Sequence, residues 1–182
     1  MTAARVTLLV GVLTASVAFF GYLLDKAAKR RDVEATHYAT GLKAVKEFEE
    51  LPYRISRRST SDGPTRTELG ERMSDIYVRI EFYRLWTIIH SSVVGECYAI
   101  LVDRDHELVR EQIKDAWASP VITIDSQNHL DGKFNLDNVD EWNLCIDVMK
   151  RELSLWSPFL RLGTRRRIKQ WHDRHPPSGP NL

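Results

Sequence analysis

The chain has 182 residues, of which 43% are hydrophobic and 28% are charged, and its formal net charge is +1. This length suffices for one globular core and excludes two full-sized domains with a linker. The nearly neutral charge excludes a protein that acts through bulk basicity. Two cysteines, Cys97 and Cys145, are too few for a disulfide-stapled secreted scaffold.

The N-terminal segment is the most informative, because residues 6–24 include no charged side chain. A helix needs about 20 apolar residues to cross the hydrocarbon core of a bilayer. A cleaved signal peptide would have a shorter apolar region and a small-residue cleavage site, whereas this run continues directly into Asp25 and Lys26. One arginine precedes the run and four basic residues follow it, at positions 26–31. By the positive-inside rule, we expect an uncleaved single-pass transmembrane anchor over residues 1–24, in the bacterial inner membrane, with the N-terminus outside.

One face of this helix carries mostly small or hydroxyl-bearing side chains at the alternating four-and-three spacing of a coiled coil. This small-residue seam consists of Thr7, Gly11, Thr14, Ala18, Gly21, Asp25 and Asp32. Small residues allow helices to approach closely, so the seam predicts self-association. With three or more protomers, Thr7 and Thr14 would line a pore and the two aspartates would form carboxylate rings. The alternative is a packing seam in a dimer.

The rest of the chain has helical periodicity, so the predicted fold class is all-α. We expect the first helix to continue as a stalk over residues 25–52 and to end before Pro52, and residues 53–67 to form a hinge loop. Thr67 is the expected N-cap of a small cytoplasmic helical bundle over residues 68–160. Within it, residues 86–102 are apolar almost all round, so a second transmembrane span is possible. His90 and Glu96, with Arg84 and Asp103 at the flanks, favour a buried core helix instead.

Residues 161–182 form a basic, partly disordered tail. Its cations surround one tryptophan: Arg165, Arg166, Arg167, Lys169 and Trp171. Arginine forks bind phosphate and tryptophan stacks on bases, so a nucleotide or oligonucleotide ligand is one interpretation. Contact with anionic lipid and ion pairing with the acidic half of a neighbouring protomer are two others. The proline-rich stretch 176–180 predicts disorder.

No catalytic motif is present: the chain has no phosphate-binding glycine loop, nucleophile elbow or zinc-protease helix motif. Residues 103–107 are acidic, but on a helix they would spread around the axis rather than converge on a metal. Residues 125–132 lack the carboxylate spacing of a calcium loop. Cys97 and Cys145 have no neighbouring base or CxxC spacing, which predicts buried thiols. We therefore expect a protein that is not an enzyme and has no metal or cofactor.

The uncharged span, the basic residues at 26–31, the helical stalk and the small helical domain together resemble, in layout, the single-pass transmembrane effectors of bacterial anti-phage systems. Those effectors form membrane channels or disruptors under the control of a nucleotide or oligonucleotide signal. The resemblance implies a homo-oligomeric ion channel or membrane-disrupting toxin, with Thr7, Thr14 and Asp25 on the conduction path and residues 165–167 contacting phosphate. The alternative function is a membrane-tethered sensor or interaction module with no pore.

Overall fold

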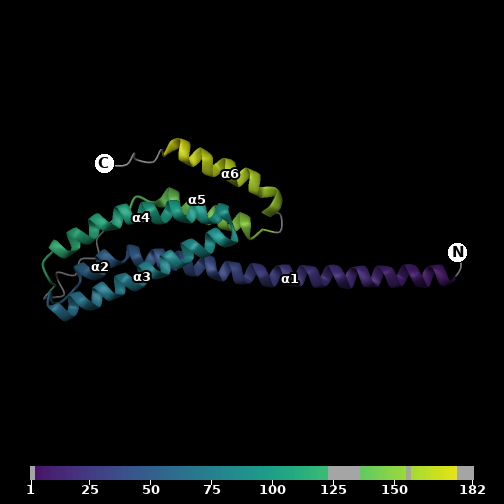
Figure 1. Ribbon diagram of the computed structural model, residues 1–182, viewed down its shortest axis with the longest axis horizontal. Coiled ribbons are helices and arrows are strands. Elements are labelled where there is room, and N and C mark those ends of the chain that lie inside the picture. Colours follow the sequence, from purple (N-terminus) through teal and green to yellow (C-terminus); the bar gives the residue numbers. More distant parts are fainter. Residues whose placement is uncertain (1–2, 123–135, 155–156, 176–182) are drawn as a thin grey trace. The chain divides into compact units, whose positions relative to one another are not determined.

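The computed structural model describes residues 3–122, 136–154 and 157–175, and within α1 and α6 the side chains of residues 3–10, 12 and 158 are not described. Every regular element in these ranges is a helix, as predicted (Figure 1). The helices are α1 (Ala3–Glu49), α2 (Leu51–Ser56), α3 (Gly63–His90), α4 (Ser92–Ala118), α5 (Val139–Glu152) and α6 (Ser157–Arg174). The chain divides into two compact units, Met1–His37 and Tyr38–Leu182. We call them the N-terminal unit and the bundle, and describe each by itself.

Helix α1 is continuous over 47 residues and ends at Glu49, before Pro52, as the sequence predicts. Pro52 lies in the first turn of α2, where its missing N–H is not needed for the helical hydrogen bonds. In the N-terminal unit, the large apolar side chains of residues 13–24 are exposed. The acidic and basic side chains that follow pair along the helix, as in the 2.8 Å ion pair between Lys29 and Asp25.

The expectation of a single-pass transmembrane anchor over residues 1–24 is wrong. Across the part of the chain that the structure describes, no helix has an apolar stretch of the length that crossing a bilayer requires. The uncharged run that suggested the anchor ends at Leu24, where Asp25 and Lys26 follow at once. The expectation of an ion channel depended on this anchor and is withdrawn with it. The same finding removes the alternative of a second span over residues 86–102.

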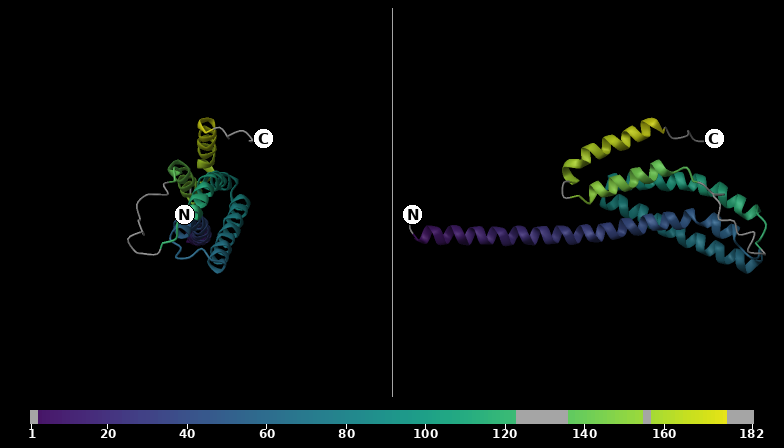
Figure 2. Two further views of the ribbon diagram at one scale, coloured as in Figure 1. Left: turned by 90° about the vertical axis from the view of Figure 1, so that its left-hand side faces the viewer. Right: turned by 180° about the vertical axis from the view of Figure 1, so that it is seen from behind.

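The bundle is organised around α4, which contacts α2, α3, α5 and α6 (Figure 2). Its core includes the fully buried side chains of Phe48 from α1, Ile80 from α3, and Tyr98 and Leu101 from α4. The Tyr98 hydroxyl donates a 3.1 Å hydrogen bond to the main-chain carbonyl of Gly41, so its one polar atom is satisfied inside the core. The end of α1 is thereby fastened to the centre of the bundle.

The expected buried helix over residues 86–102 is interrupted at Ser91, which ends α3 and caps α4. Ser91 has extended backbone angles, φ −154° and ψ 112°, and its hydroxyl accepts a hydrogen bond from the Val94 N–H. Serine at this position supplies a partner for an otherwise unpaired N–H of the first turn. The chain therefore reverses within one residue, and residues 93–102 of α4 supply the buried apolar face that the sequence predicts.

The loop before α3 is shorter than the predicted hinge, because α2 occupies residues 51–56 and α3 already begins at Gly63. The N-cap is Asp62 rather than Thr67, and its carboxylate accepts a 2.9 Å hydrogen bond from the Thr65 N–H. The Thr65 hydroxyl, together with this bond from the main chain, lowers the pKa of Asp62. The sequence Asp-Gly-Pro thus starts the helix one turn earlier than expected, with a cap followed by proline in the first turn.

Cys97 and Cys145 are free and buried, as predicted, and their sulfur atoms lie 3.7 Å apart. Burial, together with the neighbouring Cys145 thiol, raises the pKa of Cys97 well above its usual range. Helix α6 begins at Ser157 and continues to Arg174, so most of the described basic tail is helical. The predicted disordered stretch 176–180 and the rejected calcium loop at 125–132 lie outside the described residues.

Candidate functional site: an acidic cleft

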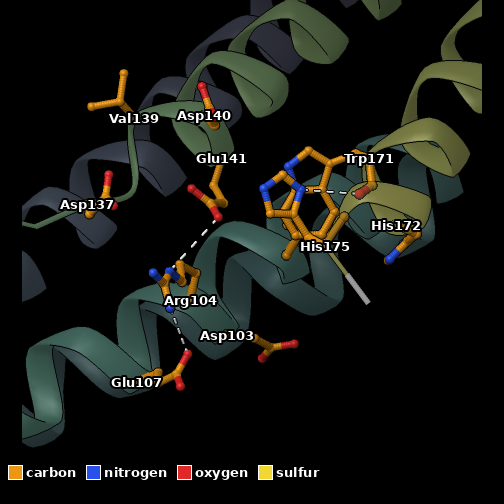
Figure 3. Close-up of a pocket in the computed structure, with 11 residues that line it drawn as sticks. Asp103, Arg104, Glu107, Asp137, Val139, Asp140, Glu141, Trp171, His172 and His175 are labelled. Atoms are coloured by element: carbon orange, nitrogen blue, oxygen red, sulfur yellow. Dashed lines mark hydrogen bonds and ion pairs between the residues drawn. The ribbon is translucent and has the colours of Figure 1, made fainter. Parts of the chain in front are cut away.

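The bundle contains a cleft of about 670 Å³ between α4, the start of α5 and the end of α6 (Figure 3). Its lining is partly polar and partly apolar, with side chains from three segments that are far apart in the sequence. The lining residues are Ile100, Asp103, Arg104, Glu107, Asp137, Val139, Asp140, Glu141, Trp171, His172 and His175. We call this site the acidic cleft.

Five of these residues are carboxylates and one, Arg104, is a permanent cation. The Arg104 guanidinium is already engaged, with Nη1 at 3.0 Å from Glu107 Oε2 and Nε at 4.0 Å from Glu141 Oε1. Asp103 pairs with Arg84 of α3 at 3.2 Å. Since one arginine cannot neutralise the carboxylates around it, the lining retains a net negative charge, which attracts cations.

The start of α5 accounts for part of this charge. Asp140 and Glu141 occupy the first turn of the helix. The positive end of the helix dipole favours acidic residues in the first turn, which accounts for their position at this edge of the cleft. Asp137 adds a third carboxylate just before the helix.

The remaining wall is aromatic. The rings of Trp171 and His175, one helical turn apart at the end of α6, are stacked with centroids 4.6 Å apart and an interplanar angle of 21° (Figure 3). The neighbouring His172 lies 3.3 Å from Glu96 of α4. The indole nitrogen of Trp171 is buried and has no hydrogen-bond partner among the described residues. A buried N–H without a partner is costly, so an acceptor that reached this donor on binding would be favoured.

A second cluster of polar side chains lies where α1, α4 and α5 meet. The Asn138 amide donates hydrogen bonds of 2.7 Å to Glu49 and 2.5 Å to Asp105, and the Trp142 indole N–H donates a 2.7 Å bond to Glu49. Asp105 is completely buried, and one of its carboxylate oxygens has no partner in the described part of the chain. Two acidic side chains therefore share one amide in the interior of the bundle.

This arrangement keeps Asp105 protonated far above the usual range of a carboxyl. Burial raises the pKa of Asp105 to about 7, the hydrogen bond from Asn138 opposes that rise, and the nearby charge of Glu49 adds to it. A buried carboxylate without a close cation is unfavourable because the charged form loses its hydration. The proton on this group is therefore retained at pH values where most carboxyls are ionised.

The glycines of the small-residue seam predicted on α1 have open space beside them. A Cβ added to Gly11 or Gly21 would meet no atom within 4 Å. Asp25 and Asp32 are exposed, and the side chain of Thr7 lies outside the described part of the structure. Among the remaining members, Thr14 and Ala18 are also exposed. The role of the seam residues, in lining a pore or in packing, stays a prediction.

The residues predicted to bind phosphate occupy different surroundings. Arg165, Arg166 and Lys169 are exposed on α6, whereas Arg167 forms an ion pair with Asp147 of α5. Trp171 lies in the wall of the acidic cleft. The structure therefore places the tryptophan beside carboxylates, and phosphate binding by the exposed cations stays a prediction.

Sequence reasoning expected the side chains of residues 103–107 to spread around a helix axis, and it overlooked the cleft. Part of the signal was present, because Asp103 and Glu107 are four residues apart and share one face of α4, and acids occupy the first turn of α5. Their convergence depends on how α4, α5 and α6 pack, which the local sequence does not encode.

Comparison of the chain with protein-family models, with curated proteins and with solved structures gives no match. Within the described residues, no group of histidine, cysteine, aspartate and glutamate side chains has an arrangement that could hold a metal ion. The argument for function therefore starts from the chemistry of the acidic cleft.

Proposed function

We propose that this protein is a binding module, and that its acidic cleft receives a basic side chain from a peptide segment of a partner. This is the interaction-module function that the sequence left open, without its membrane tether. The observation that carries the proposal is the convergence of five carboxylates on one cleft that contains a single, already paired arginine. A guanidinium or ammonium group entering the cleft would meet unneutralised negative charge on several sides.

Trp171 supports a basic side chain as the ligand in two ways. Its ring, stacked on His175, offers a π-face to a guanidinium or ammonium group at the edge of the cleft. Its buried, unpartnered indole N–H would donate to a main-chain carbonyl of the ligand if binding exposes it. A peptide supplies both a cation and carbonyl oxygens, whereas an inorganic cation or a polyamine supplies no acceptor. Peptide recognition therefore uses more of the site.

The test is fluorescence anisotropy of a labelled peptide with several arginines, titrated with the full chain. We expect binding that weakens as salt rises, because exposed charges are screened over about 8 Å at physiological ionic strength. A peptide with glutamine in place of each arginine should not bind. The double variant Glu107→Gln, Asp140→Asn should weaken binding roughly tenfold or more, which corresponds to about 1.4 kcal/mol.

The matched control is Glu111→Gln, since Glu111 lies one turn beyond Glu107 on α4, is paired with Lys114, and does not line the cleft. Equal losses for Glu111→Gln and for the cleft variants would show only a general effect of net charge and would refute the proposal. So would equal affinity for the arginine and glutamine peptides.

The exposed cations of α6 support a second candidate, the phosphate ligand that the sequence predicts. Arg165, Arg166 and Lys169 would contact a nucleotide or oligonucleotide on the outside of the helix. A labelled oligonucleotide that binds the chain, and is released by Arg165→Gln with Arg166→Gln but not by the cleft variants, would favour this candidate over the peptide.

A further inference from the structure

Two exposed apolar stripes run along helices of different units. On α1 the stripe consists of Leu13, Val17, Phe20 and Leu24, and on α3 it consists of Val78, Phe82, Leu85 and Ile89. Their side chains are between 55% exposed, at Phe82, and 79% exposed, at Ile89. Contiguous exposed apolar side chains of this size mark interaction surfaces rather than ordinary protein surface. We call them the α1 stripe and the α3 stripe.

The two stripes have the same spacing, because each occupies positions i, i+4, i+7 and i+11 of its helix. This is the alternation of a coiled-coil seam, which places four side chains in one row along a helix. Read in the reverse direction, the steps are still four, three and four, so the stripes match when the helices run antiparallel. The matching layers are Leu24 with Val78, Phe20 with Phe82, Val17 with Leu85, and Leu13 with Ile89.

Charge beyond the stripes favours the same alignment. After Leu24, α1 continues into a basic stretch at residues 26–31, and the next positions of its stripe are Ala27 and Arg31. Before Val78, the corresponding positions of α3 are acidic and exposed, at Asp75 and Glu71. In antiparallel register these ends meet, with Arg31 opposite Glu71. A parallel arrangement would instead bring the acidic end of α3 to the uncharged beginning of the α1 run.

The other side of α3 is already covered within the bundle. Tyr38 of α1 contacts Trp86 with ring centroids 5.7 Å apart, and Phe48 contacts Tyr77 at 5.1 Å. Helix α1 has no break between Ala3 and Glu49. The residues of the α3 stripe take no part in these ring contacts and are exposed.

We infer that the α3 stripe is the docking site for the α1 stripe of a second copy of this chain, packed antiparallel with Arg31 beside Glu71. Each copy carries both stripes, so two copies can exchange their N-terminal units reciprocally, or several can close a ring. The interface covers apolar side chains on both helices, which favours association. The acidic cleft contributes nothing to it, so this inference is independent of the proposed function.

The test is sedimentation of the full chain as a function of concentration. We expect the wild type to be oligomeric, and either Phe20→Glu or Phe82→Glu to shift it to the 21.1 kDa monomer. The matched controls are Phe19→Glu on α1 and Phe159→Glu on α6, because both side chains are exposed phenylalanines outside the stripes. Circular dichroism establishes that each variant keeps its helices.

Charge reversal tests the register independently. Arg31→Glu and Glu71→Arg should each weaken association several-fold, and the two changes together should restore it. Mixing a Phe20→Cys chain with a Phe82→Cys chain under oxidation should give a cross-linked heterodimer, since the native thiols are buried.

Four results would overturn the inference. One is a wild-type chain that stays monomeric at high concentration. Binding of that monomer to lipid vesicles would not rescue the inference. The others are equal losses for the control and stripe variants, no restoration by the double charge reversal, and no cross-linked heterodimer in the mixture of the two cysteine variants.

Discussion

Asn138 donates its side-chain amide to the Glu49 carboxylate at 2.7 Å, across 89 positions of the chain. The same amide reaches Asp105, so one neutral residue serves two acidic side chains that come from α1 and α4. Buried carboxylates are tolerated when hydrogen bonds replace their lost hydration. Asn138 does this only in part, because the second oxygen of Asp105 has no partner among the described residues.

Replacing Asp105 with asparagine should make the stability of the bundle less dependent on pH. In the unfolded chain Asp105 loses its proton near its ordinary pKa of 3.8, whereas in the folded chain the pKa is about 7. Between these values the folded state binds more protons, so the free energy of unfolding falls as pH rises, by at most about 1.4 kcal/mol per pH unit. Below this window the group has no effect, and above it the loss is complete.

Asp105→Asn cannot ionise and keeps the shape of the side chain. We therefore expect its stability relative to wild type to grow between about pH 4 and pH 7 and then to level off, as measured by urea unfolding. The control is Asp115→Asn, an exposed aspartate on the same helix. A difference between Asp105→Asn and wild type that does not change with pH would contradict the prediction.

Arg58 should be irreplaceable by lysine. Its buried guanidinium donates to the main-chain carbonyls of Ile55, Ala116, Trp117 and Ser119 at 2.7–3.0 Å, and to the Ser61 hydroxyl at 2.8 Å. Two of these carbonyls end α4 and have no partner within the helix. Lysine has three donors and no planar fork, so it would leave several buried carbonyls unpaired.

We expect Arg58→Lys to cost about 2–4 kcal/mol of unfolding free energy, as measured by chemical denaturation. Arg57→Lys is the matched control, since Arg57 is the preceding residue and is exposed. Similar stability for the two variants would show that the forked hydrogen bonds contribute little.

Gly95→Ala should destabilise the junction of α3 and α4. A Cβ at Gly95 would lie 2.6 Å from Ile88 Cγ1 and 2.7 Å from its Cα, and the main chain at Ile88 cannot move aside as a flexible side chain could. We expect a loss of about 1–3 kcal/mol in thermal or urea unfolding. Gly70→Ala, in a helix interior with no atom near its Cβ, should instead stabilise by about 0.5–1 kcal/mol. The opposite signs make the pair informative, and a stabilising Gly95→Ala would disprove the close approach.

The sequence predicted the parts of the fold that local periodicity determines. The end of α1 before Pro52, the buried face of α4 and the burial of both cysteines depend on residues close together in the chain. The break at Ser91 was missed because apolar residues continue on both sides of it, so the hydrophobic pattern hides a serine cap. The transmembrane prediction was wrong because it rested on the absence of charge over residues 6–24.

The candidate site was harder to predict than the fold. Acidic residues at 103–107 and 137–141 are each ordinary at a helix surface, and only the packing of α4 against α5 brings them to one cleft. Arg58 was assigned to a loop, where nothing in the neighbouring residues reveals that the end of α4 needs its donors. Long-range contacts of this kind are not encoded in any one segment.

The one-residue junction at Ser91 also bears on the order in which the chain assembles. Helices α3 and α4 are adjacent in sequence and meet closely at Ile88 and Gly95, so the entropy lost in bringing them together is small. The bond between Glu49 and Asn138 closes a far longer loop and brings two acidic groups together out of water. We therefore expect the α3–α4 hairpin to form early in the folding transition, and the polar junction of α1, α4 and α5 to close last.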